Sequence, residues 1–190
     1  LENSAKKPIV NVTKSISKGH RINLGEIVPN GTNFNLVVNT NNSLGIIIDF
    51  ACFGLSYSKK LENENYMIFF NKPCTPCGGV GISSLTDDSV IFKVDLSKLP
   101  PEIHRLVFTA AIDGDALLSQ LNNGYLDFVQ NGNETARFSF TGSDFSTERS
   151  VMILEIYLKD RIWKASAIGQ GFDGRLDYLV EHFGGVIIQE

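Results

Sequence analysis

Two cysteines spaced as Cys74-Thr75-Pro76-Cys77 form the clearest reactive pattern in the sequence. A C-x-x-C pair can act as a thiol–disulfide couple or supply half of a tetrahedral zinc site. Zinc needs two more ligands, and no second close pair exists among the remaining cysteine and histidines, which are Cys52, His20, His104 and His182. Redox pairs of this kind normally begin a helix, whereas this one follows an apolar stretch and precedes Gly78-Gly79. We therefore expect a plain loop with two thiols, and keep a thiol-based redox or metal-handling protein as the alternative function.

Patterns for other chemistry are weaker. A nucleophilic hydrolase needs a serine or cysteine beside a histidine and an acid, and the sequence contains no G-x-S-x-G nucleophile turn. The glycines Gly169, Gly171 and Gly174 fit the G-x-G-x-x-G pattern of phosphate-binding loops. That pattern also requires a parallel βαβ unit and an acidic residue about 20 positions later, and the chain has room for neither. We expect these glycines to be structural, and we expect the protein not to be an enzyme.

A single acidic residue interrupts the longest apolar stretch of the chain, Gly45–Leu55. If this stretch is a buried strand, the Asp49 carboxylate must be exposed, paired with a cation or bound to a metal. Two further acids, Asp113 and Asp115, flank a glycine and fit a hairpin loop, although they could add oxygen ligands. Asp49 is thus the acid whose surroundings matter most.

Short segments rich in Val, Ile and Phe predict the strands that position these residues. They are Ile9–Ile16, Phe34–Val38, Ile46–Phe53, Tyr66–Phe70, Val90–Val94, Leu106–Ile112, Tyr125–Val129, Arg137–Phe140, Val151–Leu158 and Ile162–Ala167. Turn sequences such as Pro29-Asn30-Gly31 separate them. Many short strands without alternating long helices predict a mainly β fold, namely a two-sheet β-sandwich.

One helix is expected after Gly174, because apolar residues recur there at helical spacing up to Phe183. Asp173 is the expected N-cap and Gly184 the expected C-cap. A second helical turn is expected over Ser97–Ile103. The fold should therefore include a C-terminal helix, which covers one end or face of the sandwich, and one or two short helical connectors.

Composition narrows the class of protein. With 43% hydrophobic and 20% charged residues, the 190-residue chain can bury a core of its own. A net charge of −4 with scattered basic residues argues against nucleic acid as a partner. No stretch approaches the roughly 18 apolar residues of a membrane span. Three cysteines, an odd number, fit a reducing cytoplasm better than a disulfide scaffold.

We divide the chain into an N-terminal segment, residues 1–15, and one domain, residues 16–188. The first segment should hold the first strand, and its start at Leu1 resembles the cut edge of a longer chain. We find no internal repeat or charge block that would mark a second domain boundary.

A long motif near the carboxyl end resembles the C-terminal signature of the TerD family of tellurium-resistance and stress-response proteins. It runs from Trp163 to Leu176 and closes in His182-Phe183-Gly184. Further similar segments occur in the same order upstream: Ser17-Lys18-Gly19 with Ile22-Asn23-Leu24, Phe69–Pro73, Val94–Pro100, Ser146-Thr147-Glu148 and Leu154–Tyr157. The resemblance covers nearly the whole chain. It implies a cytoplasmic stress-response domain that binds or scaffolds other proteins within a multidomain or multiprotein stress assembly.

The resemblance also implies calcium binding. Typical members carry an Asp-x-Asp pair on an early strand and a long acidic loop, and this chain has Ile47 in place of the first aspartate and only Ser83–Ser89 as the loop. The implied metal residues are Asp49, Asp87 and Asp88. Calcium takes six to eight oxygen ligands, so we expect affinity to fall towards or beyond about 10⁻³ M. In the alternative interpretation Asp87 and Asp88 form an ordinary polar turn, and Asp49 lies near a strand bend or pairs with a lysine or arginine.

Overall fold

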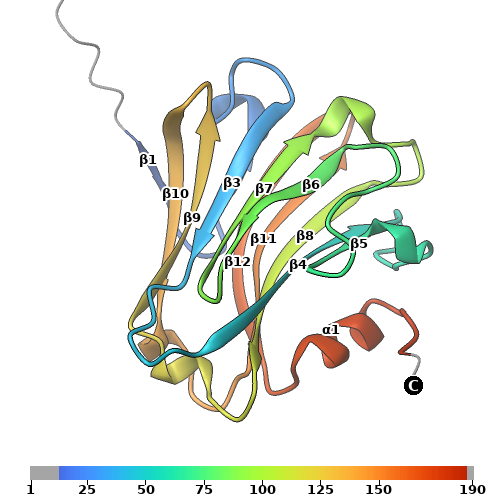
Figure 1. The fold of residues 1–190 in the computed structure, drawn as a ribbon. Coiled ribbons are helices and arrows are strands. Elements are labelled where there is room, and N and C mark those ends of the chain that lie inside the picture. Colours follow the sequence, from blue (N-terminus) through green and yellow to red (C-terminus); the bar gives the residue numbers. More distant parts are fainter. Residues whose placement is uncertain (1–12, 188–190) are drawn as a thin grey trace, which may run out of the picture.

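The computed structural model describes residues 13–187, which form two six-stranded sheets packed face to face (Figure 1). Sheet A contains, in spatial order, β1 (Lys14–Ile16), β10 (Asn133–Thr141), β9 (Asn123–Gln130), β3 (Asn33–Asn39), β7 (Ser89–Asp95) and β6 (Val80–Leu85). Sheet B contains β2 (Arg21–Asn23), β12 (Ile162–Phe172), β11 (Ser150–Lys159), β8 (Arg105–Asp113), β4 (Ile47–Leu55) and β5 (Met67–Ile68). Neighbouring strands are antiparallel except β1 and β10, which are parallel. The predicted two-sheet β-sandwich is confirmed.

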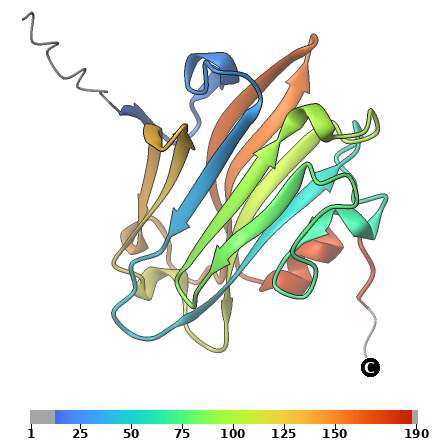
Figure 2. The same ribbon diagram turned by 45° about the horizontal axis from the view of Figure 1, so that its top comes forward.

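The main core lies between the two sheets (Figure 2). Successive residues of a strand point to opposite faces, so alternate apolar residues of β3 and β7 point inward. In β3 these are Phe34, Leu36 and Val38, all buried. Across the core, the rings of Phe92 and Phe108 lie 5.2 Å apart at their centroids. Sheet A therefore has one buried face, which explains its alternating sequence.

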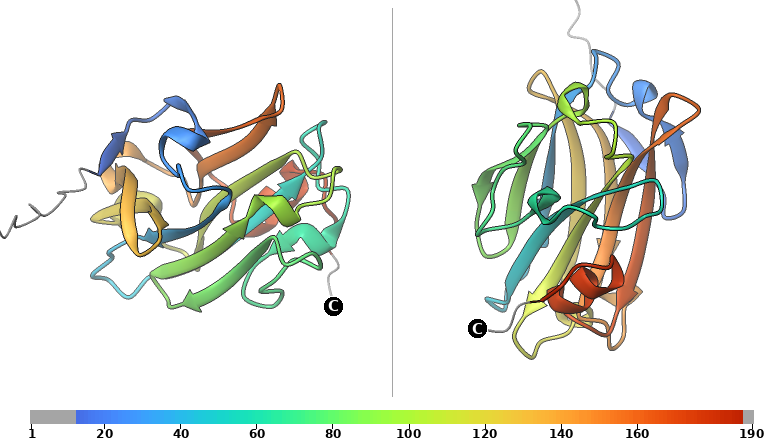
Figure 3. Two further views of the ribbon diagram at one scale, coloured as in Figure 1. Left: turned by 90° about the horizontal axis from the view of Figure 1, so that it is seen from above. Right: turned by 90° about the vertical axis from the view of Figure 1, so that its right-hand side faces the viewer.

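A second core lies on the outer face of sheet B, under α1 (Leu176–His182). Leu179 and Phe183 pack there against Phe53 of β4 and Val107 of β8. Figure 3 shows α1 lying across the outer face of this sheet. Central strands of sheet B are thus buried on both faces, which is why Ile46–Phe53 reads as a nearly continuous apolar run rather than an alternating one.

The helical elements differ from the prediction in number and capping. Residues 13–187 contain five short 3-10 turns rather than one or two connectors: η1 (Leu24–Glu26), η2 (Glu64–Tyr66), η3 (Leu96–Lys98), η4 (Leu118–Gln120) and η5 (Gly142–Asp144). The N-cap position of α1 is Arg175, not Asp173. The Asp173 carboxylate instead accepts a hydrogen bond from the Thr147 hydroxyl at 2.7 Å, which holds it before the helix begins. The C-cap position is Phe183, and the expected C-cap Gly184 follows it with φ of +80°.

Several strand boundaries also differ. The predicted strand Tyr66–Phe70 is only Met67–Ile68, because Tyr66 ends η2 and Phe69 bonds to Lys72 in a turn. Of the predicted strand Ile9–Ile16, only β1 is seen, and residues 9–12 lie outside the described residues. The polar stretch Ser83–Ser89 is not a loop throughout. β6 extends to Leu85 and β7 begins at Ser89, so a short turn joins the two strands in a hairpin.

Candidate functional site

Asp49 lies near the start of β4, on the outer face of sheet B and beyond the cover of α1. Its β8 partner is Ala111, and the neighbouring pair is Ile47 with Asp113, so the two carboxylates share one face. Asp49 is half-buried. Burial, and secondly the nearby charge of Asp113, raises the pKa of Asp49 above its ordinary value. The structure therefore brings Asp49 together with Asp113, which the sequence offered as a possible further oxygen ligand.

The β6–β7 turn brings a third acid to the same place. The backbone N–H of Ile48 donates to the carbonyl oxygen of Asp87 at 2.8 Å, which joins the turn of sheet A to the edge of β4 in sheet B. Asp87 lines a depression of about 360 Å³ together with Asp49 and Asp113. Three exposed apolar side chains, Ile47, Phe70 and Leu85, line it as well. We call this site the β4 depression.

Asp88, the remaining predicted ligand, does not line the β4 depression. Its carboxylate accepts a hydrogen bond from the Thr86 hydroxyl at 3.0 Å. Its carbonyl oxygen accepts bonds from the backbone N–H of Thr40 at 2.9 Å and from the Thr40 hydroxyl at 3.1 Å. Asp88 thus tightens the hairpin and ties it to the end of β3.

The carboxylates as placed do not fit a resident calcium ion. Within residues 13–187, no three His, Cys, Asp or Glu side chains are grouped so that they could hold a metal ion. The carbonyl oxygens of Asp87 and Asp88 already accept backbone hydrogen bonds, so the turn offers few free oxygens. Calcium needs six to eight of them. Calcium binding by Asp49, Asp87 and Asp88 stays a prediction, which calcium titration can test.

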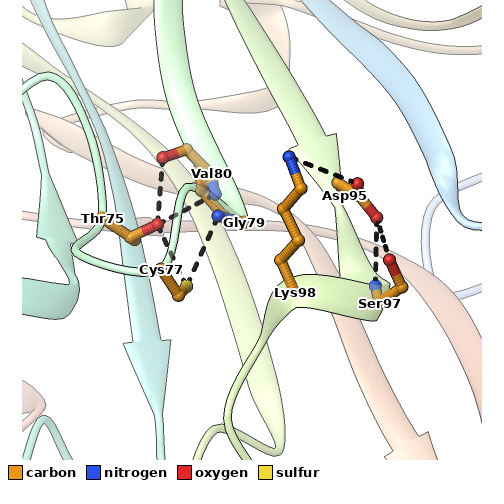
Figure 4. Close-up of polar contacts among 7 residues, drawn as sticks. All are labelled: Thr75, Cys77, Gly79, Val80, Asp95, Ser97 and Lys98. Atoms are coloured by element: carbon orange, nitrogen blue, oxygen red, sulfur yellow. Dashed lines mark hydrogen bonds and ion pairs between the residues drawn. The ribbon is translucent and has the colours of Figure 1, made fainter.

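The C-x-x-C pair lies in a turn that hydrogen bonds hold in place, and Figure 4 shows those of Thr75 and Cys77. Buried Thr75 bonds to Val80 through its backbone N–H at 2.9 Å and accepts from the Val80 N–H at 3.1 Å. The Cys77 sulfur accepts from the Gly79 N–H at 3.4 Å, and both thiols are free. The pair precedes no helix, so nothing in its surroundings supports the redox alternative over a plain loop.

The glycine pattern at residues 169–174 is structural, as expected. Gly169 and Gly171 belong to β12, which runs antiparallel to β11. Gly169 has φ of +59° where the register shifts opposite Met152 and Leu154, which marks a bulge. A Cβ on Gly174 would lie 2.2 Å from that of Tyr178. The phosphate-loop interpretation therefore lacks its βαβ context.

Sequence reasoning named Asp113 as a possible oxygen ligand but missed its position on a strand, and it missed the apolar residues of the β4 depression. Asp113 fits a hairpin loop in the sequence, but it is the last residue of β8 and pairs with Ile47. Phe70 and Leu85 come from separate hairpins, and their exposure could not be read from the sequence. The one pattern that could have indicated the strand position of Asp113 is that it directly follows the apolar run Leu106–Ile112.

No helix within residues 13–187 has the length and apolar character to cross a membrane.

Comparison with known proteins places this fold in a family. Residues 12–183 match the TerD domain. YceE, an uncharacterized protein of Bacillus subtilis (strain 168), is 32% identical over 188 residues, which cover 89% of this chain and 96% of YceE. Tellurium resistance protein TerD of Serratia marcescens is 26% identical, covering 90% of this chain and 96% of that protein. General stress protein 16U of Bacillus subtilis (strain 168) is 28% identical, covering 91% and 98%.

Solved structures agree with the fold. The crystal structure of a Streptomyces coelicolor A3(2) homologue of telluride resistance protein (TerD) superposes with a TM-score of 0.64 at 16% identity. The superposition covers 82% of this chain and 99% of that one. Because the family match also spans residues 12–183 of the 190, the chain belongs to the TerD family, which includes tellurium resistance and general stress proteins.

Proposed function

We propose that this protein is a stress-response binding domain, not an enzyme, and that its β4 depression receives a basic and apolar segment of a partner protein. The relatives named for tellurium resistance and general stress support the biological setting. The chemistry of the β4 depression supports the choice of partner.

The observation that carries the proposal is an exposed apolar rim beside acids that lack cationic partners. Ile47, Phe70 and Leu85 are 45%, 56% and 40% exposed. Asp49, Asp87 and Asp113 take part in none of the ion pairs formed within the described part of the chain. Clustered exposed apolar side chains commonly mark binding surfaces. Unpaired acids next to them complement a partner that carries lysine or arginine beside an apolar anchor.

The surroundings of Asp49 favour the same kind of partner. A cationic side chain that enters the β4 depression would relieve the repulsion between Asp49 and Asp113, which partly accounts for the raised pKa of Asp49. Such a partner requires fewer fixed oxygen ligands than calcium does. The segment therefore fits the residues present better than a resident ion does.

Growth protection tests the proposal. The chain is expressed in a bacterial host that lacks its own TerD-family genes, and growth is measured in tellurite. We expect Phe70→Ser and the triple change Asp49→Asn, Asp87→Asn, Asp113→Asn each to abolish the protection that the unaltered chain gives. Ile162→Ser is the matched control, because Ile162 is 49% exposed and lies on another hairpin of sheet B. Full protection by both altered chains would refute the proposal.

A photo-crosslinking residue at position 70 gives a direct readout. We expect it to capture one discrete protein through a segment containing lysine or arginine, and the triple asparagine change to remove the product. A crosslinker at position 57 is the control, since Tyr57 is 83% exposed but does not line the β4 depression. Capture through an acidic or uncharged segment would contradict the stated chemistry.

Calcium is tested separately by titration. Binding to the native state alone must raise the melting temperature. We expect no rise in calcium up to about the millimolar range, the weak end of protein calcium sites. A rise that Asp49→Asn abolishes would restore the calcium interpretation.

A further inference from the structure

A second hollow lies at the other end of β4, beyond the C-terminal end of α1. Its volume is about 340 Å³, and buried apolar side chains of both sheet and helix form its floor: Leu55, Val107, Met152 and Phe183. The segment after β4 forms one wall through Ser58, Lys59 and Lys60. Figure 3 shows this segment and α1 on the same side of sheet B. We call this hollow the α1 pocket.

The α1 pocket is positively charged in a chain whose net charge is −4. Lys59, Lys60 and Arg105 line it against one acid, Glu155, which pairs with Arg105. His182 of α1 adds an imidazole at the rim. Lys59 and Lys60 belong to none of the ion pairs formed among residues 13–187. Two lysines are therefore available to an incoming anion.

Arg105 adds a third cation to the wall of the α1 pocket and is not fully hydrogen-bonded. Its guanidinium contacts Glu155 through one terminal nitrogen and lies over the ring of Tyr157, 5.2 Å from the centroid. Its Nε is buried and has no hydrogen-bond partner. Most buried polar groups in folded proteins are hydrogen-bonded, so this unpartnered donor is an exception, and it belongs to a residue that lines the α1 pocket.

The end of α1 does not oppose an anion as a bare helix C-terminus would. Two of its last carbonyl oxygens are already bonded: that of Glu181 to the Gly184 N–H and that of Val180 to the Gly185 N–H, both at 2.8 Å. The Leu61 N–H donates to the Phe183 carbonyl oxygen at 2.8 Å, which holds the lysine segment against the helix. These bonds occupy the carbonyl groups that would otherwise repel negative charge.

Gly184 gives Lys60 the room it occupies. A Cβ at Gly184 would lie 3.2 Å from Cδ of Lys60, and the φ of +80° already disfavours other residues. The stem of Lys60 therefore lies along the end of the helix. Its position next to the apolar floor sets a cation beside buried hydrocarbon, which is the arrangement that an amphipathic anion requires.

We infer that the α1 pocket binds a small organic anion, with a phosphate or carboxylate group at Lys59, Lys60 and Arg105 and an apolar group on the floor formed by Leu55, Val107, Met152 and Phe183. The volume is near the lower end of the range for small-molecule pockets, which suits a ligand of one ring or a short acyl chain. This site is separate from the β4 depression, and its test does not depend on the proposed function.

Four probes separate the contributions of charge and apolar area: phenyl phosphate, benzoate, inorganic phosphate and benzyl alcohol. Each is titrated into the full chain, and binding is followed by calorimetry and by amide shifts of Lys60 and Gly184. We expect phenyl phosphate or benzoate to bind, and whichever binds more tightly identifies the anionic group. Inorganic phosphate and benzyl alcohol should each bind at least about tenfold more weakly, because each lacks one half of the ligand.

Variants then locate the site. We expect Lys59→Gln with Lys60→Gln to weaken the better probe by about tenfold or more, because charge-assisted hydrogen bonds are lost. Lys93→Gln is the matched control, since Lys93 is an exposed lysine on β7 of the other sheet, and it should leave binding unchanged. Melting temperatures of all variants verify folding. Binding that the double change leaves intact, or no binding by either aromatic anion at about 10 mM, would overturn the inference.

Discussion

Replacing Leu179 by alanine tests whether α1 is a stabilising part of the domain. Leu179 is fully buried and packs with Phe53, Val107 and Phe183. The change removes three carbon atoms, which at about 0.8 kcal/mol for each buried carbon is about 2.4 kcal/mol of transfer free energy. The space left behind adds to this loss, so we expect the free energy of unfolding to fall by about 3–4 kcal/mol.

Urea unfolding at 25 °C, followed by the fluorescence of Trp163, measures the change. With a slope of about 2 kcal/mol per molar urea, the midpoint should fall by about 1.5–2 M while the slope stays constant. Glu181→Ala is the control on the same helix, because Glu181 is exposed, and it should change stability by less than about 0.5 kcal/mol.

A loss below about 1 kcal/mol for Leu179→Ala would refute the second core as a stabilising unit. Seven residues do not form a stable helix alone, so α1 cannot retain its structure without these contacts. If α1 amides exchanged rapidly while the midpoint stayed fixed, the helix would unfold locally rather than with the sandwich, which is the same refutation by another observable.

Three other changes test separate features, with stability measured by urea unfolding in each. Gly142→Ala should cost about 2 kcal/mol or more, since its Cβ would lie 2.1 Å from the backbone oxygen of Leu121. Asp127→Asn should cost about 1–3 kcal/mol, because buried Asp127 accepts from Nε and Nη2 of Arg137 at 2.6 and 2.7 Å. Asp49→Asn should stabilise the protein near pH 7, because burial and Asp113 raise the pKa of Asp49 and make its ionised form unfavourable in the folded state. This gain should vanish below about pH 4, where the carboxyl is protonated in both states, and a gain that persisted there would contradict the assignment.

The main strands could be predicted because most of their side chains are buried, which makes their sequences strongly apolar. Segments such as Leu106–Ile112 are apolar, β-branched and bounded by turn residues, and they form β8 almost as predicted. No pattern predicts β2, where only Ile22 is buried, or β6, whose glycine and serines resemble a turn. Those strands form because neighbouring strands offer them hydrogen-bond partners: β2 pairs with β12, far away in the chain, and β6 pairs with β7 across a short turn.

The candidate site was predictable only in part, because it depends on register. Asp49 stood out as an acid in an apolar run, and Asp87 as a turn residue. Their proximity to Asp113 depends on the pairing of β4 with β8 and on the bond between Ile48 and Asp87, which joins the two sheets. A shift of one residue in the register between β4 and β8 would move the Asp49 or Asp113 side chain to the opposite face of sheet B.

Both proposed sites follow from how little of the outer face of sheet B the helix covers. The seven residues of α1 extend only about 10 Å at about 1.5 Å per residue, and the helix lies across the strands, so it covers only part of the length of the nine-residue β4. The outer cluster that includes the helix buries Ala51, Phe53 and Leu55 of β4 and leaves the start of the strand, with Asp49, uncovered. Acids gather at that uncovered start and lysines lie in the segment that follows β4, so two surfaces of opposite charge flank one short helix.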